Sequence, residues 1–140
     1  MIERTPEGLY CRAADAWVDP WRPVPRALIT HAHADHARPG CGEYWAVASS
    51  EGVLRQRLGQ NISLHPIQYG EEHWLGQCRV SFHSAGHVLG SAQIRLEVDG
   101  EVWVVSGDYK RDADPSCDPF EPVPCDVLIT EATFGLPIYR

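Results

Sequence analysis

The stretch ITHAHADHARPG, residues 29–40, places three histidines and an aspartate within six positions, directly after a short apolar run. In an extended loop, residues i and i+2 project the same way, so His31 and His33 can converge on one cation. Asp35 and His36 follow at once and can serve a second cation about 3.5–4 Å away. Imidazole suits zinc, while a mixed nitrogen and oxygen set also admits manganese. The pattern predicts a metal site, and the alternative is a solvated, histidine-rich loop without a ligand role.

Two later segments strengthen the metal interpretation. SAGHVLGSA places His87 in a glycine-flanked turn after one strand, and VVSGDYKRD places Asp108 just past the end of another. A lone histidine or aspartate at a strand end is usually structural. The ordered series of a histidine-rich loop, a histidine, an aspartate and finally Glu131, each after a strand, is much harder to obtain by chance.

The hydrophobic pattern predicts a strand-rich chain with one or two helices. Strands are expected over residues 8–12, 16–19, 27–30, 44–48, 78–84 and 127–130. The segment SAQIRLEVDGEVWVVSGD alternates apolar and polar residues around Asp99-Gly100, which predicts a hairpin with a type I′ turn. A helix is expected over residues 51–58, capped by Ser49 or Ser50 and ended by Gly59.

Length, composition and charge set the class of protein. The 140 residues, 44% of them hydrophobic, can build one ordinary domain or a piece of a larger one. No apolar run approaches the ~18 residues of a membrane span, and the N-terminus has no signal-peptide pattern, so a cytoplasmic location is expected. Five scattered cysteines without a CxxC pair indicate reduced thiols.

A net charge of −7 disfavours general binding to a phosphate backbone. Two divalent cations would bring the total near −3 (−7 + 4), so any attraction for nucleic acid is expected to be local to the metal site.

At this point a family resemblance is clear. HAHADH, His87 in AGHVLGS and Asp108 in SGDY resemble the metallo-β-lactamase fold, and TEATFG at 130–135 resembles its β-CASP nuclease branch. The stretches LYC, DPWRPV, ITHAHADHARPG, AGHVLGSAQ, VWVVSGDYKRD and TFGLPIYR are together similar to the bacterial ligase-associated DNA exonucleases. The resemblance implies an α+β protein, with residues 1–140 forming the N-terminal half of an αββα sandwich.

The resemblance also implies a role for each motif residue. The resemblance implies two divalent metals, for which zinc is expected in preference to manganese. The first metal would be held by His31, His33 and His87, and the second by Asp35 and His36. Asp108 would lie between the two metals. Asp19, followed here by Pro20-Trp21 where many members have a glycine, resembles an aspartate that supports the histidine loop. Glu131 matches an acid that pairs with a downstream histidine near the leaving group. Asp35, Asp108 and Glu131 are therefore the candidate catalytic residues.

In the family, a β-CASP domain and a returning segment of the metallo-β-lactamase domain follow TFG, and neither is contained in these 140 residues. That segment carries the histidine paired with the acid and the last ligand of the second metal, so residues 1–140 alone are expected to be inactive. We also expect them to supply only one sheet and its covering helix, which would leave apolar residues such as Ile94 and Leu96 without a partner.

The function that follows is metal-dependent hydrolysis of phosphodiester bonds in nucleic acid. A DNA exonuclease of DNA repair or processing is favoured over an RNA-processing enzyme, with a DNA ligase and a helicase as candidate partners and no membrane association. Candidate substrate contacts are Lys110, Arg111, Arg38 and Ser91, whereas the five tryptophans are interpreted as packing residues. The alternatives are a thioester or lactone hydrolase similar to glyoxalase II and a non-catalytic scaffold subunit.

Overall fold

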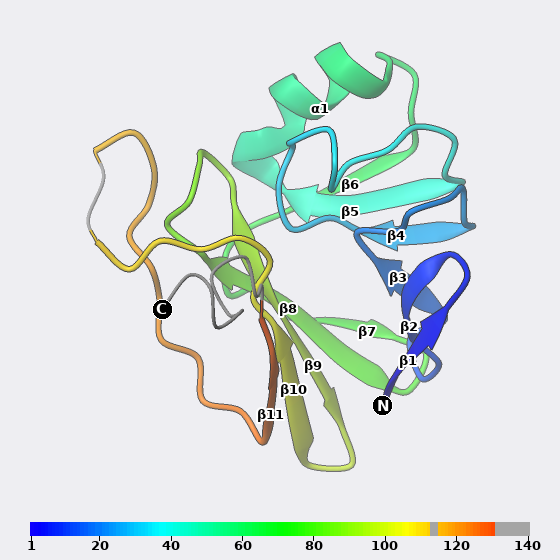
Figure 1. Ribbon diagram of the computed structural model, residues 1–140, viewed down its shortest axis with the longest axis vertical. Helices are drawn as coiled ribbons and strands as arrows, with labels where there is room; N and C mark the ends of the chain where they lie inside the picture. Colours follow the sequence, from blue (N-terminus) through cyan, green and yellow to red (C-terminus); the bar gives the residue numbers. More distant parts are fainter. Residues whose placement is uncertain (113–114, 131–140) are drawn as a thin grey trace, which may run out of the picture.

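The computed structural model describes residues 1–112 and 115–130, which form two β-sheets and one α-helix (Figure 1). The first sheet has the strand order β1-β2-β3-β4-β5-β6. Its strands are β1 (Ile2–Thr5), β2 (Gly8–Cys11), β3 (Ala16–Val18), β4 (Arg26–Leu28), β5 (Glu43–Val47) and β6 (Leu64–Ile67). The first two pairings are antiparallel and the remaining three are parallel, so the ends of β3 and β4 lie side by side.

The second sheet has the order β11-β10-β9-β8-β7. Its strands are β7 (His73–Leu75), β8 (Cys78–Ser84), β9 (Ala92–Val98), β10 (Glu101–Val105) and β11 (Val127–Ile129). Only the pairing of β10 with β11 is parallel. The predicted hairpin is confirmed, because Asp99 and Gly100 both have positive φ between the paired residues Val98 and Glu101. Positive φ at both central residues is what a type I′ turn requires.

The helix α1 (Glu51–Leu58) has the predicted bounds and covers the outer face of the first sheet. Its buried residue Leu54 packs with Tyr44 and Ala46 of β5. Gly59 ends the helix with φ 122°, as expected. The predicted serine cap differs in detail, because the Ser50 hydroxyl donates to the Val47 carbonyl within the short 3₁₀ helix η1 (Ala48–Ser50) instead of accepting a helix N–H.

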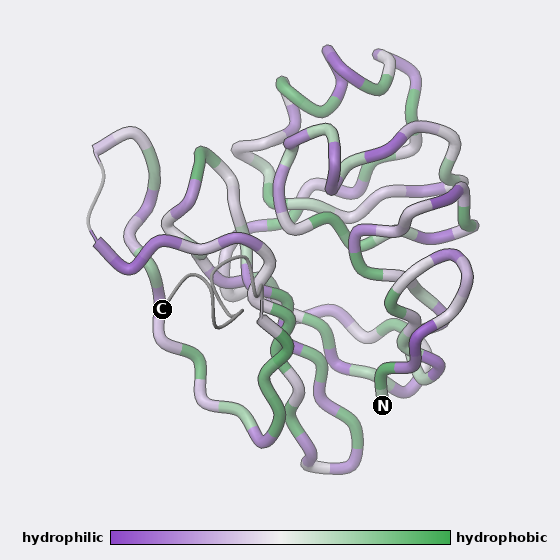
Figure 2. Tube along the Cα trace, viewed as in Figure 1, coloured by the Kyte–Doolittle hydropathy of each residue, from purple (hydrophilic) through white to green (hydrophobic). Residues whose placement is uncertain are grey.

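The main core lies between the two sheets. Val18 and Leu28 of the first sheet meet Phe82, Ile94 and Leu96 of the second, and all five side chains are buried. Figure 2 shows hydrophobic stretches along the strands of this core. The expectation of a single sheet with an uncovered inner face is therefore wrong, since the chain contributes strands to both sheets. The described residues build the first helical layer and both sheets of the sandwich.

Three strands were not predicted, namely β1, β6 and β7. Each has only three or four residues and forms an edge of its sheet, where half-exposed positions blur the alternation of polar and apolar residues. The cysteines are free thiols, as predicted. No helix among the described residues is long and apolar enough to cross a bilayer.

Candidate metal centre

The histidine loop leaves the first sheet at the end of β4 and is fixed there by Thr30. The Thr30 amide donates to Asp19 Oδ1 at 2.8 Å, and its hydroxyl donates to Asp19 Oδ2. Its carbonyl accepts the Ala92 amide at 2.7 Å, which joins the loop to the first residue of β9. Asp19 follows β3, the parallel neighbour of β4, and has φ +44°, so its carboxylate reaches back to the loop. These bonds hold the loop at the junction of the two sheets.

Four potential ligands converge at this junction. One ligand atom from each of His31, His33, His87 and Asp108 lies within 4.8 Å of the others. His31 Nε2 and His87 Nε2 lie 3.5 Å and 3.8 Å from Asp108 Oδ2. Tetrahedral coordination with bonds of ~2.1 Å separates ligand atoms by ~3.4 Å, so this spacing fits one zinc-sized cation.

Two of these nitrogens are also buried without a hydrogen-bond partner, His31 Nε2 and His87 Nε2. Burying a polar atom without a partner costs ~1–3 kcal/mol, and a bound cation would satisfy both atoms at once. The His31 Nδ1 atom lies 3.0 Å from the Thr30 hydroxyl, which leaves its Nε2 atom directed at the site. The donor set therefore fits the predicted first metal.

A second position lies beside the first, around His36. Its Nε2 atom is 3.5 Å from Asp108 Oδ2 and 3.5 Å from Asp35 Oδ2. Asp108 Oδ2 is thus at the same distance from His31 and His36, and its predicted place between two cations stays a prediction. Asp35 is not among the four converging residues, and its side chain is 73% exposed. This second donor set is more open than the first.

Asp19 supports His36 from behind. Its Oδ2 atom lies 2.7 Å from His36 Nδ1, which orients Nε2 toward Asp108. Asp19, His31 and His36 also lie close enough to form a cation site on distance alone. We interpret them instead as support for the ligands, because the Asp19 oxygens already accept hydrogen bonds from Thr30. A carboxylate that orients a ligating histidine is a common feature of metal centres.

The pKa values of His31 and His36 are shifted in opposite directions. Burial and, to a smaller extent, the nearby His36 together lower the pKa of His31 to about 3, so the ring is neutral and able to ligate a metal. Burial also lowers the pKa of His36, but the hydrogen bond to Asp19 and the charges of Asp19, Asp108 and Asp35 together raise it above its usual value. The raised pKa of His36 thus reflects the negative charge of the carboxylates that surround the second position.

The candidate substrate contacts are dispersed. Lys110 and Arg111 are exposed after Asp108, but Arg111 lines a separate cavity with Phe120. Arg38 is half-buried near the end of the histidine loop. These three stay predictions. Glu131, the candidate acid, lies outside the described residues.

Ser91 supports the loop of His87. Its side chain is buried, and its hydroxyl accepts the amides of His87 at 3.0 Å and Val88 at 3.2 Å. A hydroxyl buried in this way is not open to a substrate, so the structure places Ser91 behind the His87 loop and not at the predicted substrate contact.

Three positions near the ligands were not identified from the sequence. Thr30 connects Asp19, His31 and β9, as described above. Gly107 packs against Thr30 so closely that a Cβ atom on it would lie 2.7 Å from Thr30 Cβ. Arg57 of α1 donates to the Ala32 carbonyl inside the histidine loop. Only Gly107 carried a sequence signal, as the glycine directly before a candidate ligand.

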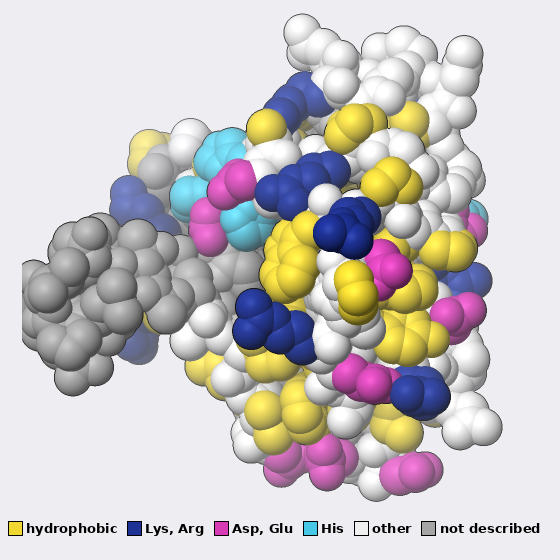
Figure 3. Space-filling view, turned by 45° about the vertical axis from the view of Figure 1, so that its right-hand side comes forward, with side chains coloured by type: hydrophobic (Ala, Val, Ile, Leu, Met, Phe, Trp, Pro, Cys, Tyr) yellow, Lys and Arg dark blue, Asp and Glu magenta, His cyan; other side chains and the backbone are white. Residues whose placement is uncertain are grey.

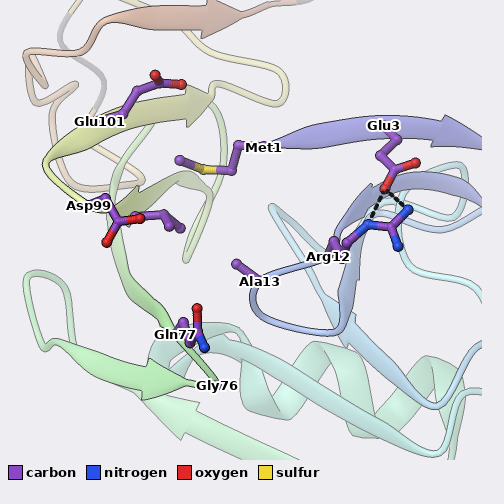
Figure 4. Close-up of a pocket in the computed structure, with 9 residues that line it drawn as sticks. Met1, Glu3, Arg12, Ala13, Gly76, Gln77, Asp99 and Glu101 are labelled. Carbon is purple, nitrogen blue, oxygen red and sulfur yellow. Dashed lines mark hydrogen bonds and ion pairs between the residues drawn. The ribbon is translucent and has the colours of Figure 1, made fainter.

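Two cavities can be compared with this site. One of about 180 Å³ opens directly onto it and is lined by Asp19, Asp35, His36 and Asp108 together with apolar residues of both sheets. A larger one, of about 880 Å³, lies at the other ends of β9 and β10, near Asp99 and Glu101 (Figure 4). Neither histidine nor cysteine lines the larger cavity, and the Glu3–Arg12 ion pair occupies part of its wall. Of the candidate ligands among the described residues, Asp35, His36 and Asp108 line the smaller cavity and none lines the larger one.

Comparisons with known proteins agree with this geometry. A protein from Opitutus terrae named as a probable DNA ligase is 34% identical over 94% of this chain, which corresponds to 13% of that protein. A ribonuclease of Thermus thermophilus is 32% identical over 80% of this chain and 32% of its own length. Drosophila melanogaster cleavage and polyadenylation specificity factor 73 is 31% identical over 82% of this chain and 18% of its own length.

Among solved structures, the Rm3 metallo-β-lactamase superposes with a TM-score of 0.55 at 17% identity, over 75% of this chain and 56% of that one. No family model matches the chain. The fold and the site together define a protein with the metallo-β-lactamase fold. Within that fold, the names of the sequence relatives agree with the resemblance to the β-CASP nuclease branch that the motifs predicted. The chain spans less than a third of the length of these relatives.

Proposed function

We propose that the protein hydrolyses phosphodiester bonds in nucleic acid with two divalent metal ions. The observation that carries this proposal is the pair of buried, unpartnered Nε2 atoms of His31 and His87 that face Asp108. Divalent cations held there would supply Lewis-acid activation of water and offset the charge of the phosphate. The relatives named as a ribonuclease and as a probable DNA ligase support a nucleic-acid substrate.

The chain's own residues have separate tasks in this proposal. His31, His33 and His87 would hold the first cation, and the half-buried Asp108 carboxylate, which lies near both His31 and His36, would be available to both cations. His36 is kept in orientation by Asp19 and, with Asp35, faces the open side of the site. Glu131 stays the proposed acid near the leaving group, in partnership with a downstream histidine. For that reason we expect no turnover from residues 1–140 by themselves.

DNA exonuclease action in repair is the finer proposal, supported by the motifs shared with ligase-associated exonucleases and by the Opitutus relative. An RNA substrate is the second candidate, because the Thermus and Drosophila relatives have names connected with RNA cleavage. A DNA ligase and a helicase stay proposed partners, zinc the proposed metal, and the cytoplasm the proposed location.

The test uses the intact, metal-loaded protein and end-labelled single-stranded DNA, the matching RNA and a thioester as substrates. We expect stepwise shortening of the DNA, and Asp108→Asn should lower turnover about 100-fold or more, because the amide removes the charge shared by two cations. Asp99→Asn in the distant hairpin turn is the matched control and should leave turnover unchanged.

Thioester hydrolysis without nucleic-acid cleavage would contradict the proposal. Absence of bound metal would instead support the scaffold alternative.

A further inference from the structure

We propose that Trp21 is a stacking platform for a nucleobase of the substrate, next to the reacting phosphodiester, with Arg4 as its cationic neighbour. This inference rests on the proposed function and adds a binding subsite to it. The Trp21 side chain is large and apolar, yet it is 45% exposed. It lines the same cavity of about 180 Å³ as Asp35, His36 and Asp108. Trp21, like the 65% exposed Trp74, is thus not fully packed, in contrast to the interpretation of all five tryptophans as packing residues.

The backbone fixes Trp21 firmly beside the metal ligands. It stands two residues after Asp19, the support of His36, and its amide donates to the Glu7 carbonyl at 2.7 Å. Gly8 lies against the indole, because a Cβ atom built there would be 3.7 Å from Trp21 Cδ2. A fixed backbone at Trp21 lowers the conformational freedom that a ligand of the ring would have to remove.

The surroundings of Trp21 suit a nucleotide more than an apolar ligand. The Arg4 guanidinium carbon is 5.9 Å from the ring centroid, at the outer limit of a cation–π contact, so it is weakly held. Arg4 and Arg22, the latter next to Trp21 in the chain, are both exposed. Figure 3 shows Lys and Arg side chains gathered with hydrophobic ones beside the histidines and acids of this face. A base on the indole with its phosphate near these cations would satisfy both features.

The apolar wall of the cavity connects this platform to the metal ligands. Leu9, Val105 and Ile129 complete the wall between the two sheets. A base seated against Trp21 would therefore lie in the same continuous depression as Asp108. We infer that stacking on Trp21 sets which phosphodiester of a strand faces the metals.

The experiment compares the intact protein with Trp21→Ala, Trp21→Phe and the control Trp74→Ala. Trp74 on β7 is a matched control, because it is 65% exposed, has the Arg79 guanidinium 5.4 Å from its ring and does not line this cavity. The readouts are the dissociation constant of a short single-stranded oligonucleotide and the KM and kcat of its cleavage. A second probe has the same backbone with abasic nucleotides.

Loss of one stacking platform should weaken oligonucleotide binding by about 5- to 150-fold for Trp21→Ala, less for Trp21→Phe and not at all for Trp74→Ala. The weakening should appear in KM, and the abasic probe should bind wild type and Trp21→Ala equally. The inference is overturned if Trp21→Ala binds the oligonucleotide as tightly as wild type does. It is also overturned if the substitution weakens binding of the abasic probe as much as binding of the oligonucleotide. A wild-type protein that cleaves no nucleic acid at all would instead overturn the proposed function.

Discussion

At the scale of single residues, the site depends on how Asp19 and Asp108 divide their work. Asp108 faces the candidate ligand nitrogens of His31, His36 and His87. Asp19 instead contacts the other ring nitrogen of His36, Nδ1. One carboxylate is thus placed to touch cations, and the other is placed to orient a ligand. The two should respond differently to substitution.

Asp19→Ala removes the acceptor of His36 Nδ1 and both acceptors of Thr30. We expect the affinity for the second metal to fall about 10–100-fold, the usual effect of losing such a support, while the first metal stays bound. Metal titration against a chelator measures both affinities in the intact protein. Equal weakening of both metals, or of neither, would show that Asp19 does not act through His36.

The low pKa of His31 predicts an acid-sensitive metal-free protein. The folded-state pKa, about 3, lies below the ordinary value of 6.5, so the unfolded chain binds one more proton in this interval. The contribution of His31 to stability is therefore complete above pH 6.5 and is lost toward pH 3, at no more than ~1.4 kcal/mol per pH unit.

His31→Gln cannot be protonated and should flatten this part of the stability curve, measured by denaturant unfolding between pH 4 and pH 7. An unchanged slope would mean that His31 titrates normally in the folded protein. The raised pKa of His36 acts in the opposite sense and at higher pH, where its contribution is lost as the pH rises through its folded-state value.

At the scale of elements, the site forms where β4 of the first sheet ends against β9 and β10 of the second. The contact of Gly107 with Thr30 allows this approach. Gly107 has φ +59°, and the added Cβ atom would lie 2.7 Å from Thr30 Cβ and 2.8 Å from its hydroxyl. A side chain at this point would push the two sheets apart beside the ligands.

Gly107→Ala should therefore lower the free energy of unfolding and the affinity for metal together. Overpacking of this kind costs ~1–3 kcal/mol in addition to the strain of positive φ. Gly100→Ala is the matched control, because Gly100 has φ +81° and no atom within 4 Å of its added Cβ. Thermal unfolding and metal titration of both variants separate the effect of the steric clash with Thr30 from the effect of the positive φ angle, which both glycines share. Equal destabilisation of the two would remove the proposed role of this contact.

Local patterns predicted the elements that have strong signals. Asp99-Gly100 between alternating residues gave the β9–β10 hairpin, and the helix over 51–58 had Gly59 to end it. The edge strands β1 and β7 were missed because their exposed positions have no clear period. The convergence of the candidate ligands could be predicted from HAHADH, His87 and Asp108. The support from Arg57 could not, since its contact with Ala32 depends on how α1 packs.

At the scale of the whole molecule, the candidate metal site lies between two sheets that are separate in sequence. His31, His33 and His36 come from the first sheet, and His87 and Asp108 come from the second. A cation bound to both sets would hold the sheets together, so metal binding and packing of the core should support each other. The exposed Trp21 lies at the same junction, which brings the proposed base-binding surface and the metals to one cavity.

The most direct test of this account is anomalous diffraction from crystals of the metal-loaded protein, collected at the absorption edges of zinc and manganese. The account predicts one peak at a bonding distance of ~2.0–2.2 Å from His31 Nε2 and His87 Nε2. It predicts a second peak about 3.5–4 Å away, beside His36 and Asp108. Metal peaks only at other positions, or a fully loaded crystal with no peak between these histidines and Asp108, would contradict the central claim.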